Sequence, residues 1–596
     1  MDSDEETKDE IQAILKEFDD YQILPGPILQ KILRFKAALL NEIDGSELDL
    51  ILYLVESHIP GLRLKAEIQI DINEFQRKTE NSILNREHLC FPNSHMLSLG
   101  QADIDVMLER IAEMPKEWTI IQITPQFSNE EIFATDSKHI STKGIYVTVF
   151  NCGRRSEVPY CVNLPNDVLT TREDMRMLKN NLKEALSLPQ REGMNEQQQT
   201  NTLSYKQRKL YHKKKAHMEE TLEAIVRDLE DYWLGVWRCL LIGKYKNELI
   251  DQEIRSLVKK FLAEKSRENV SEKVMNILVQ AVKGMPGNEY NMEKYLPIIL
   301  DYCFPGENLC NAWKLFWRKH KILTGKEERH PVILIVDETL DALPWEMINT
   351  LSNQPTSRMP SLHLLYAIYK AHEDSIIDGY KVISNYQNGR FILNPGLDLG
   401  QMEERLKTFF EYWLPEWTGI AGKTPNSAEF RDLVTSANIF SYSGHGSGAQ
   451  YCPSDKIQKK KIDSVVLLFG CGSTQLVEQG PEVEMYGTSQ MYLLAACPCL
   501  IGMLWVVTDV ETDLLTTRLL SSWIPNSKKA HWQCVDQIEW AQSGKVIIKE
   551  NEYPEAILEP DLLKALCIAK NGIKYLCNKA AVVARGIPVK LVNPIS

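Results

Sequence analysis

The sequence predicts an α/β protein whose last third forms a parallel sheet covered by helices on both faces. From His330 onward, short apolar runs alternate with helical patterns, and the expected strands are 332–336, 390–393, 438–442, 465–469 and 500–507. Runs that are apolar without a break are typical of strands buried on both faces of a parallel sheet. The length of 596 residues is enough for about three to five domains.

The elements before this sheet follow in order. Residues 1 to about 95 show helical periodicity, in 11–18, 28–40 and 48–55. β-branched runs at 118–124 and 144–150 predict that a first sheet region begins there. Residues 188–204 are polar and patternless, which indicates a solvated connection, and long helical patterns follow over 205–242 and 248–283.

One apolar run, 491–507, approaches the length of a membrane span. It contains Pro498 and Gly502, so we interpret it as a buried helix that leads into a buried strand. We therefore expect no association with a membrane.

Composition excludes several classes of protein. With 68 Lys and Arg against 81 Asp and Glu, the net charge is -13, so direct, sequence-specific binding of nucleic acid is not expected. The thirteen cysteines form no C-x-x-C pair, which is typical of reduced intracellular thiols. The acidic first ten residues lack an apolar signal segment, so the expected location is the cytoplasm.

A basic run lies at the start of the first long helical pattern. Six of the eleven residues 205–215 are Lys or Arg, from Lys206 to Lys215. Two interpretations stay open: a solvated helix face, or a patch for nuclear import or for an anionic partner.

The chemistry is expected on two loops that follow predicted strands. The strand 438–442 runs into Ser-Gly-His445-Gly-Ser-Gly-Ala, and the strand 465–469 runs into Gly-Cys471-Gly-Ser-Thr. Loops at the carboxyl ends of neighbouring parallel strands converge, so His445 and Cys471 are expected to face one site. A thiol, an imidazole and free backbone amides are the minimum for acyl transfer, which predicts a cysteine hydrolase.

No metal or organic cofactor is expected. Cys497 and Cys499, with Cys452 and His445, were considered as zinc ligands, but two cysteines separated by a single proline are poorly spaced for a tetrahedral site.

The two loops also resemble the catalytic dyad of separase, a caspase-related cysteine protease of the cohesin cycle. Three further segments agree with this resemblance: 336–346 (Val-Asp-Glu-Thr-Leu-Asp-Ala-Leu-Pro-Trp-Glu) before an expected first helix, 358–361 (Arg-Met-Pro-Ser) after it, and 497–509. The resemblance is good over about 330–525 and weaker over 92–165. Its short length makes the chain most similar to insect separases.

The resemblance implies three regions. They are an N-terminal helical region over 1–95, an inactive caspase-like companion domain over 96–327 with a helical insertion at about 170–320, and an active caspase-like protease domain over 328–596. Most separases carry a very large helical region before the protease. We therefore expect a separate helical scaffold subunit, with residues 1–95 as its docking region.

The same resemblance implies the function and the roles of individual residues. The chain would cleave the kleisin subunit of cohesin after an arginine at anaphase, and a securin-type inhibitor would hold it inactive. Cys471 would be the nucleophile and His445 the proton donor, with the amides of Gly446 and Cys471 binding the oxyanion. Asp513 is the expected arginine-reading acid, with Asp509 and Glu511 as neighbours, and Glu482 and Glu484 are alternatives.

The sequence departs from the family pattern at Gly472, where many separases have Ser, and we expect the loop to tolerate this change. Two other functions stay open: a catalytically silent scaffold that binds an extended peptide, and a cysteine hydrolase acting on small amides. The expected location is cytoplasmic, with access to the nucleus and chromosomes in mitosis.

Overall fold

The fold begins with helices, as the sequence predicts. The computed structural model describes residues 26–43, 45–75, 83–94, 99–127, 142–155, 157–165, 177, 205–267, 269–284, 289–319, 327–480, 483–526, 529–549 and 558–592. The N-terminal helices are α2 (Gly26–Glu42), α3 (Glu47–Glu56), α4 (Pro60–Phe75), α5 (Arg86–Leu89) and α6 (Gln101–Glu113). The helical pattern predicted at 11–18 lies outside the described residues.

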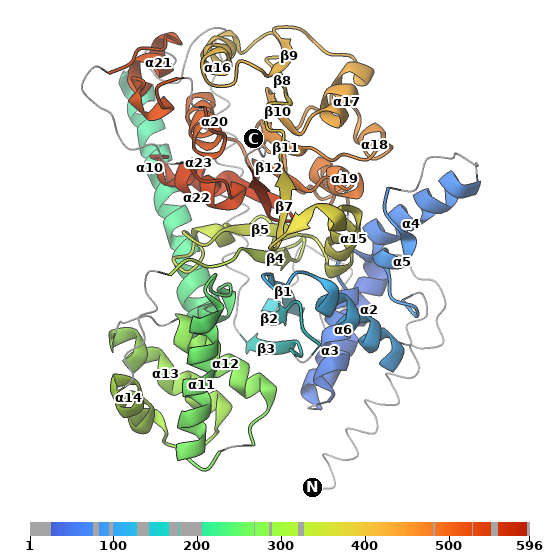
Figure 1. Cartoon of the computed structure of the whole chain (residues 1–596), viewed down its shortest axis with the longest axis vertical. Coiled ribbons are helices and arrows are strands. Elements are labelled where there is room, and N and C mark those ends of the chain that lie inside the picture. The colour runs from blue at the N-terminus through green and yellow to red at the C-terminus, as the bar shows by residue number, and fades with distance from the viewer. Residues whose placement is uncertain are drawn as a thin grey trace.

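A first set of strands and a helical insertion follow. The strands are β1 (Thr119–Phe127), β2 (Thr142–Asn151) and β3 (Tyr160–Pro165). The insertion contains α10 (Tyr205–Asp228), a π-helical turn (Leu229–Leu234), a 3-10 helix (Gly235–Leu241), α11 (Glu248–Glu264), α12 (Glu272–Gly284), α13 (Glu289–Cys303) and α14 (Cys310–Lys319). The helices α11 to α14 gather at one end of the molecule, whereas α10 extends along its side toward α22 and α23 (Figure 1).

The remaining residues alternate strands and helices. The strands are β4 (Val332–Val336), β5 (Thr356–Met359), β6 (Ile376–Ile377), β7 (Tyr380–Ile383), β8 (Gly389–Leu393), β9 (Thr418–Ala421), β10 (Ile439–Ser443), β11 (Val465–Phe469), β12 (Cys499–Met503), β13 (Val582–Gly586) and β14 (Val589–Leu591). The helices are α15 (Leu362–His372), α16 (Gly400–Trp413), α17 (Ser427–Ser436), α18 (Ser454–Ile457), α19 (Thr488–Leu494), α20 (Asp509–Trp523), α21 (Gln537–Ser543), α22 (Leu562–Asn571) and α23 (Leu576–Ala581).

One eleven-stranded sheet runs through the molecule, in the order β3-β2-β1-β4-β5-β13-β12-β11-β10-β8-β9. We call β3 to β5 of this order the first half and β13 to β9 the second half. Within the first half β1, β4 and β5 are parallel, and within the second half β12, β11, β10, β8 and β9 are parallel. Because β13 is parallel to β5 but antiparallel to β12, the parallel strands of the two halves run in opposite directions.

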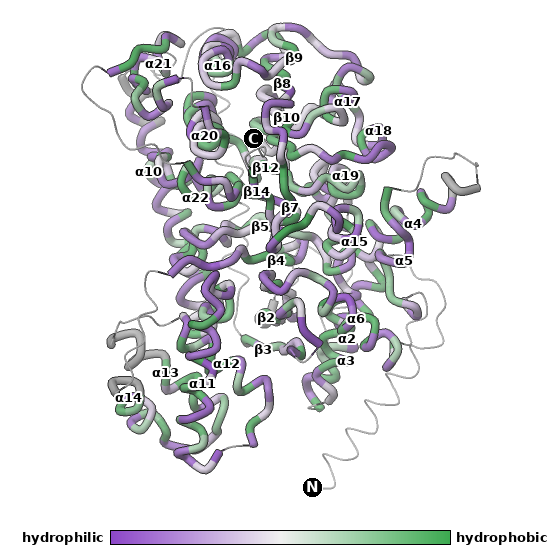
Figure 2. Tube along the Cα trace, in the orientation of Figure 1, coloured by the Kyte–Doolittle hydropathy of each residue, from purple (hydrophilic) through white to green (hydrophobic). Residues whose placement is uncertain are grey.

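Both faces of the sheet are covered, which confirms the predicted α/β class. Along β11, Val465, Leu467 and Phe469 belong to the hydrophobic core on one face, whereas Val466 and Leu468 belong to the core on the other. All five are almost fully buried. In Figure 2 the central strands around β12 are hydrophobic, whereas α10 and α18 carry many hydrophilic residues.

The N-terminal helices share the second of these cores with the sheet. Ile51 and Leu54 of α3 are fully buried in the same cluster as Ile120 of β1. Arg34 of α2 forms a buried ion pair with Asp337, directly after β4. The described helices therefore pack as part of the main body, while their role as a scaffold dock stays a prediction.

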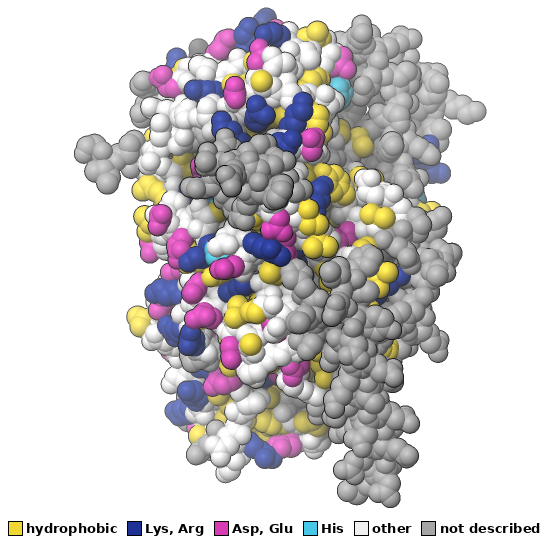
Figure 3. Space-filling view, turned by 90° about the vertical axis from the view of Figure 1, so that its right-hand side faces the viewer, with side chains coloured by type: hydrophobic (Ala, Val, Ile, Leu, Met, Phe, Trp, Pro, Cys, Tyr) yellow, Lys and Arg dark blue, Asp and Glu magenta, His cyan; other side chains and the backbone are white. Residues whose placement is uncertain are grey.

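On the face shown in Figure 3, acidic and basic side chains are interspersed. The apolar run 491–507 forms α19 and β12, as predicted. Among the described helices, none is both long enough and apolar enough to cross a bilayer.

Two local predictions were wrong. The strand expected over 500–507 ends at Met503, because the following carbonyls of Trp505 and Val507 accept hydrogen bonds from the Cys471 loop instead of from a neighbouring strand. The helix expected between residues 346 and 358 is absent. Only a 3-10 turn (Trp345–Met347) forms there, and Arg358 lies on β5.

The two halves of the sheet meet at a buried ionic network. β5 and β13 share a single registered pair, Arg358 with Arg585. The Arg358 guanidinium donates to both carboxylate oxygens of Glu346, at 2.7 and 2.6 Å. Arg585 donates to both carboxylate oxygens of Asp341, at 2.8 and 2.6 Å, and to the carbonyl of Thr474 at 3.1 Å.

Replacing Arg585 with Met is expected to destabilise the protein by about 3–5 kcal/mol, because the Asp341 carboxylate would stay buried without its bidentate donor. The matched control is Arg155→Met, which breaks an exposed pair with Glu109 (2.9 Å) and should cost about 1 kcal/mol or less. Denaturant unfolding of both variants provides the measurement. Equal unfolding midpoints for the two variants would contradict the structural role of the network.

Candidate active site

His445 lies on a tight loop at the end of β10. Its carbonyl accepts hydrogen bonds from the Tyr442 hydroxyl (2.7 Å) and the Gln450 side-chain amide (2.9 Å), which fixes the backbone. Gly446 follows with a φ of +61°, a left-handed conformation that favours glycine. The imidazole is about half exposed, and its Nε2 lies 2.9 Å from Oδ2 of Asp398.

Cys471 follows β11, the strand paired in parallel with β10. The two loops touch at Gly470, where an added Cβ would lie 2.0 Å from the Gly446 carbonyl oxygen and 2.6 Å from that of Gly444. No side chain fits between them. The structure therefore brings the His445 and Cys471 loops into direct contact, at the edge where the sequence places them.

The thiol of Cys471 is hydrogen-bonded within the chain. Its Sγ donates to the carbonyl of Val507 at 3.4 Å. Burial raises the pKa of the Cys471 thiol above its ordinary value, and the nearby Asp509 carboxylate adds to this shift.

Two backbone amides beside the thiol are available to a ligand. Within the described part of the chain, no backbone carbonyl accepts a hydrogen bond from the amide of Gly446 or from that of Cys471. By contrast, the Gly472 amide donates to the Trp505 carbonyl at 3.0 Å. The positive φ of Gly472, +61°, also explains why a glycine is well accommodated there.

The three expected pocket acids lie on the first turns of α20, but they differ in access. Asp513 is only 2% exposed and receives the guanidinium of Arg405, whose Nε lies 2.7 Å from Oδ2. Asp509 shares the same guanidinium at 3.3 Å, and its side chain is 35% exposed. Glu511 is half-buried. Asp509 is thus the more accessible partner of the buried Arg405–Asp513 pair.

Glu484, one of the two alternative acids, is engaged elsewhere. Its carboxylate accepts from the amides of Gly61 and Leu62, at 2.6 and 2.9 Å, and so caps the first turn of α4. Capping of α4 therefore explains the position of the Glu484 carboxylate, and no substrate pocket is needed to explain it. The other alternative, Glu482, lies outside the described residues.

The cysteines and the acids that the structure describes do not gather into a metal site. All thirteen cysteines are free thiols. Over the described ranges, no group of three or more His, Cys, Asp or Glu side chains is arranged to hold a metal ion.

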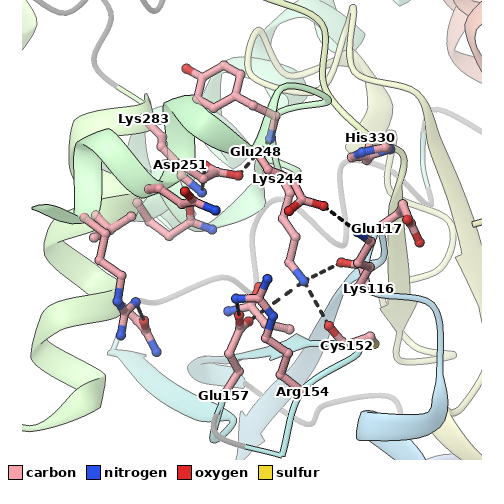
Figure 4. Close-up of a pocket in the computed structure, with 17 residues that line it drawn as sticks. Lys116, Glu117, Cys152, Arg154, Glu157, Lys244, Glu248, Asp251, Lys283 and His330 are labelled. Atoms are coloured by element: carbon pink, nitrogen blue, oxygen red, sulfur yellow. Dashed lines mark hydrogen bonds and ion pairs between the residues drawn. The ribbon is translucent and has the colours of Figure 1, made fainter. Parts of the chain in front are cut away.

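A separate polar pocket of about 140 Å³ lies between the first half of the sheet and the insertion (Figure 4). Its charges are largely matched internally. Lys116 pairs with Glu248 at 2.6 Å, and Lys244 donates to the carbonyls of Lys116 and Cys152, at 2.7 and 3.1 Å. The pocket borders the start of β1, and in the sheet order β5, β13 and β12 separate β4 from β11, so it is not part of the Cys471 site.

Asp398 is the residue that sequence reasoning missed. It follows β8, which pairs with β10, so it lies at the same sheet edge as His445. The signal was present, since Asn-Pro-Gly-Leu-Asp398 comes directly after a predicted strand. The rule that selected His445 and Cys471 also applies to this loop.

Known proteins that are similar in sequence to the chain are separins. The chain is 26% identical to the separin of Schizosaccharomyces pombe over 69% of its own length and 23% of that protein. It is 27% identical to the mouse separin over 52% of its length and 14% of that protein. The chain thus spans about a quarter or less of these relatives.

Solved structures show the same fold. The Saccharomyces cerevisiae separase in crystals of a separase–securin complex superposes with a TM-score of 0.69 at 16% identity, covering 98% of this chain and 38% of that one. A second crystal structure of that complex gives a TM-score of 0.70 at 17% identity. The model of the separin protease domain matches residues 142–512, more than half of the sequence, and the chain therefore belongs to the separin, or separase, family.

Proposed function

We propose that the chain is a cysteine endopeptidase that cleaves the kleisin subunit of cohesin after an arginine and so releases sister chromatids at anaphase. The observation that carries this proposal is the contact of the His445 and Cys471 loops through Gly470, beside two unengaged amides. Family membership supplies the substrate class.

The mechanism uses groups of the chain and one water. The Cys471 sulfur attacks the scissile carbonyl carbon, and the amides of Gly446 and Cys471 stabilise the negative oxygen. The thiol proton passes to His445, which delivers it to the leaving amine as the C–N bond breaks. Water then attacks the thioester, which releases the acid and restores the thiol.

Selection of arginine is assigned to the carboxylates at the start of α20. A buried guanidinium needs a carboxylate partner, preferably in bidentate geometry. Asp513 already holds Arg405, so a substrate arginine would share this acidic group through Asp509, whose side chain remains partly exposed. Glu511 contributes further negative charge from the same helix.

The partners are proposed from the family. A securin-type inhibitor is proposed because the solved relatives are complexes with securin. A helical scaffold subunit is proposed because the resemblance to separases implies one. A cytoplasmic location with access to mitotic chromosomes follows from the proposed substrate.

The resting state of the thiol favours one alternative, a silent scaffold that binds an extended peptide at the same place. The Cys471 sulfur donates to Val507, and burial raises its pKa, as in an inert buried cysteine. Trapping with an electrophile that carries arginine at its reactive end separates the two functions, because only an endopeptidase is labelled at Cys471 and also cleaves a kleisin peptide.

Cys471→Ser is expected to abolish cleavage of a kleisin peptide while leaving the fold and inhibitor binding intact. The change removes the polarisable nucleophile and little volume. Cleavage is measured by mass spectrometry, with Cys567→Ser, another half-buried cysteine, as the matched control that should stay active. Undiminished proteolysis by Cys471→Ser would rule out this nucleophile.

Asp509→Asn is expected to lower kcat/KM for arginine peptides by more than about tenfold, since a buried substrate guanidinium would lose a charged partner. Asp513→Asn should lower kcat/KM as well, and should also lower Tm because Arg405 would lose its buried carboxylate. Steady-state kinetics and thermal unfolding check both variants. If neither variant changes kcat/KM by tenfold, arginine is selected by another acid.

A further inference from the structure

Asp398 is presented to His445 by a loop that is joined to the His445 loop. The Asn394 amide, directly after β8, donates to the Ser443 carbonyl of β10 at 2.9 Å. Pro395 packs closely on Gly444, because a Cβ added to Gly444 would lie 2.9 Å from Cδ of Pro395. The residues before Asp398 and those before His445 therefore form one packed unit.

This loop holds an unfavourable backbone conformation. Asn394 and Leu397 have φ values of +47° and +67°, in the left-handed region, where a leucine costs about 1–2 kcal/mol. The Asn394 side chain stabilises the turn, because its Nδ2 donates to Glu403 (2.8 Å) and its Oδ1 accepts from the Leu399 amide (2.9 Å).

The ion pair between His445 and Asp398 contributes too little stability to explain why the loop keeps its strained conformation. The side chains of His445 and Asp398 are 45% and 47% exposed, and such pairs contribute only about 0–1 kcal/mol. The strain in the loop is at least as large as this gain. A strained loop that delivers one carboxylate to one imidazole is better explained by a function of that imidazole.

We propose that Asp398 is a positioning residue for His445. Its carboxylate accepts the hydrogen bond from Nε2–H, which fixes the tautomer so that Nδ1 is the nitrogen that exchanges the proton with thiol and leaving amine. Within the described residues, Nδ1 has no hydrogen-bond partner in the protein. As His445 takes up the thiol proton, Asp398 stabilises the imidazolium and stays ionised.

The inference rests on the proposed endopeptidase function, and the test uses the full chain with a kleisin peptide. Asp398→Ala and Asp398→Asn are each expected to lower kcat by roughly 100-fold, since the variants lose oriented proton transfer. KM should stay within threefold of wild type, and Tm should be unchanged. Added formate should restore part of the kcat of Asp398→Ala, because it can occupy the place of the carboxylate.

The chain offers a matched control. Asp463 pairs with Nδ1 of His372 at 3.6 Å, and its side chain is 59% exposed. Asp463→Ala removes the same kind of pair away from the site, and its kcat should stay within twofold of wild type.

The outcomes separate the two proposals. A wild-type chain that cleaves no peptide overturns the proposed function and, with it, the role of Asp398. A wild-type chain that cleaves, together with an Asp398→Ala variant whose kcat is within threefold of wild type, overturns the positioning role alone. A loss of kcat that parallels a lowered Tm and is not restored by formate also overturns it, because it indicates a structural role.

Discussion

The buried ionic network at the middle of the sheet is the constraint on which the rest of the structure depends. β5 and β13 share one registered pair, so backbone pairing contributes little to holding the two halves of the sheet together. Asp341, from the segment after β4, receives Arg585 of β13 across this boundary, and Glu346 of the same segment receives Arg358 of β5. Removing four charges from water is costly, and the cost is offset only when every partner is in place. The Thr474 carbonyl, three residues after Cys471, also accepts from Arg585, so the Cys471 loop is joined through this arginine to Asp341 of the first half.

Half of the fourteen described strands, and the position of the His445 and Cys471 loops at one sheet edge, were predictable from the sequence, because they depend on local patterns. The strands predicted at 332–336 and 465–469 match the observed bounds. An unbroken apolar run has apolar side chains on both faces of the strand, so it is buried only where helices cover both faces of the sheet. His445 and Cys471 followed from the rule that loops at one sheet edge converge.

What the sequence did not predict depends on contacts between distant residues. β5 and β13 are short, and each carries a buried arginine. Arg585 of β13 is explained only by Asp341, which lies 244 residues earlier in the chain. Asp513 was predicted to bind a substrate arginine, yet it pairs with Arg405, which lies 108 residues earlier in the chain. Glu484 was considered for the same pocket, although its partners are amides more than 400 residues away. In each case the sequence shows the charged residue but not the distant residue with which it pairs.

The close approach at Gly470 also limits how the family's chemistry can change during evolution. An alanine at this position would place its Cβ 2.0 Å from a backbone oxygen, so both loops would have to be rebuilt around it. The thiol of Cys471 faces no such obstacle, and a single substitution removes it with little change in volume. A descendant can therefore lose this thiol in one step and keep the glycine. In such lineages the packing between the loops would outlast the thiol.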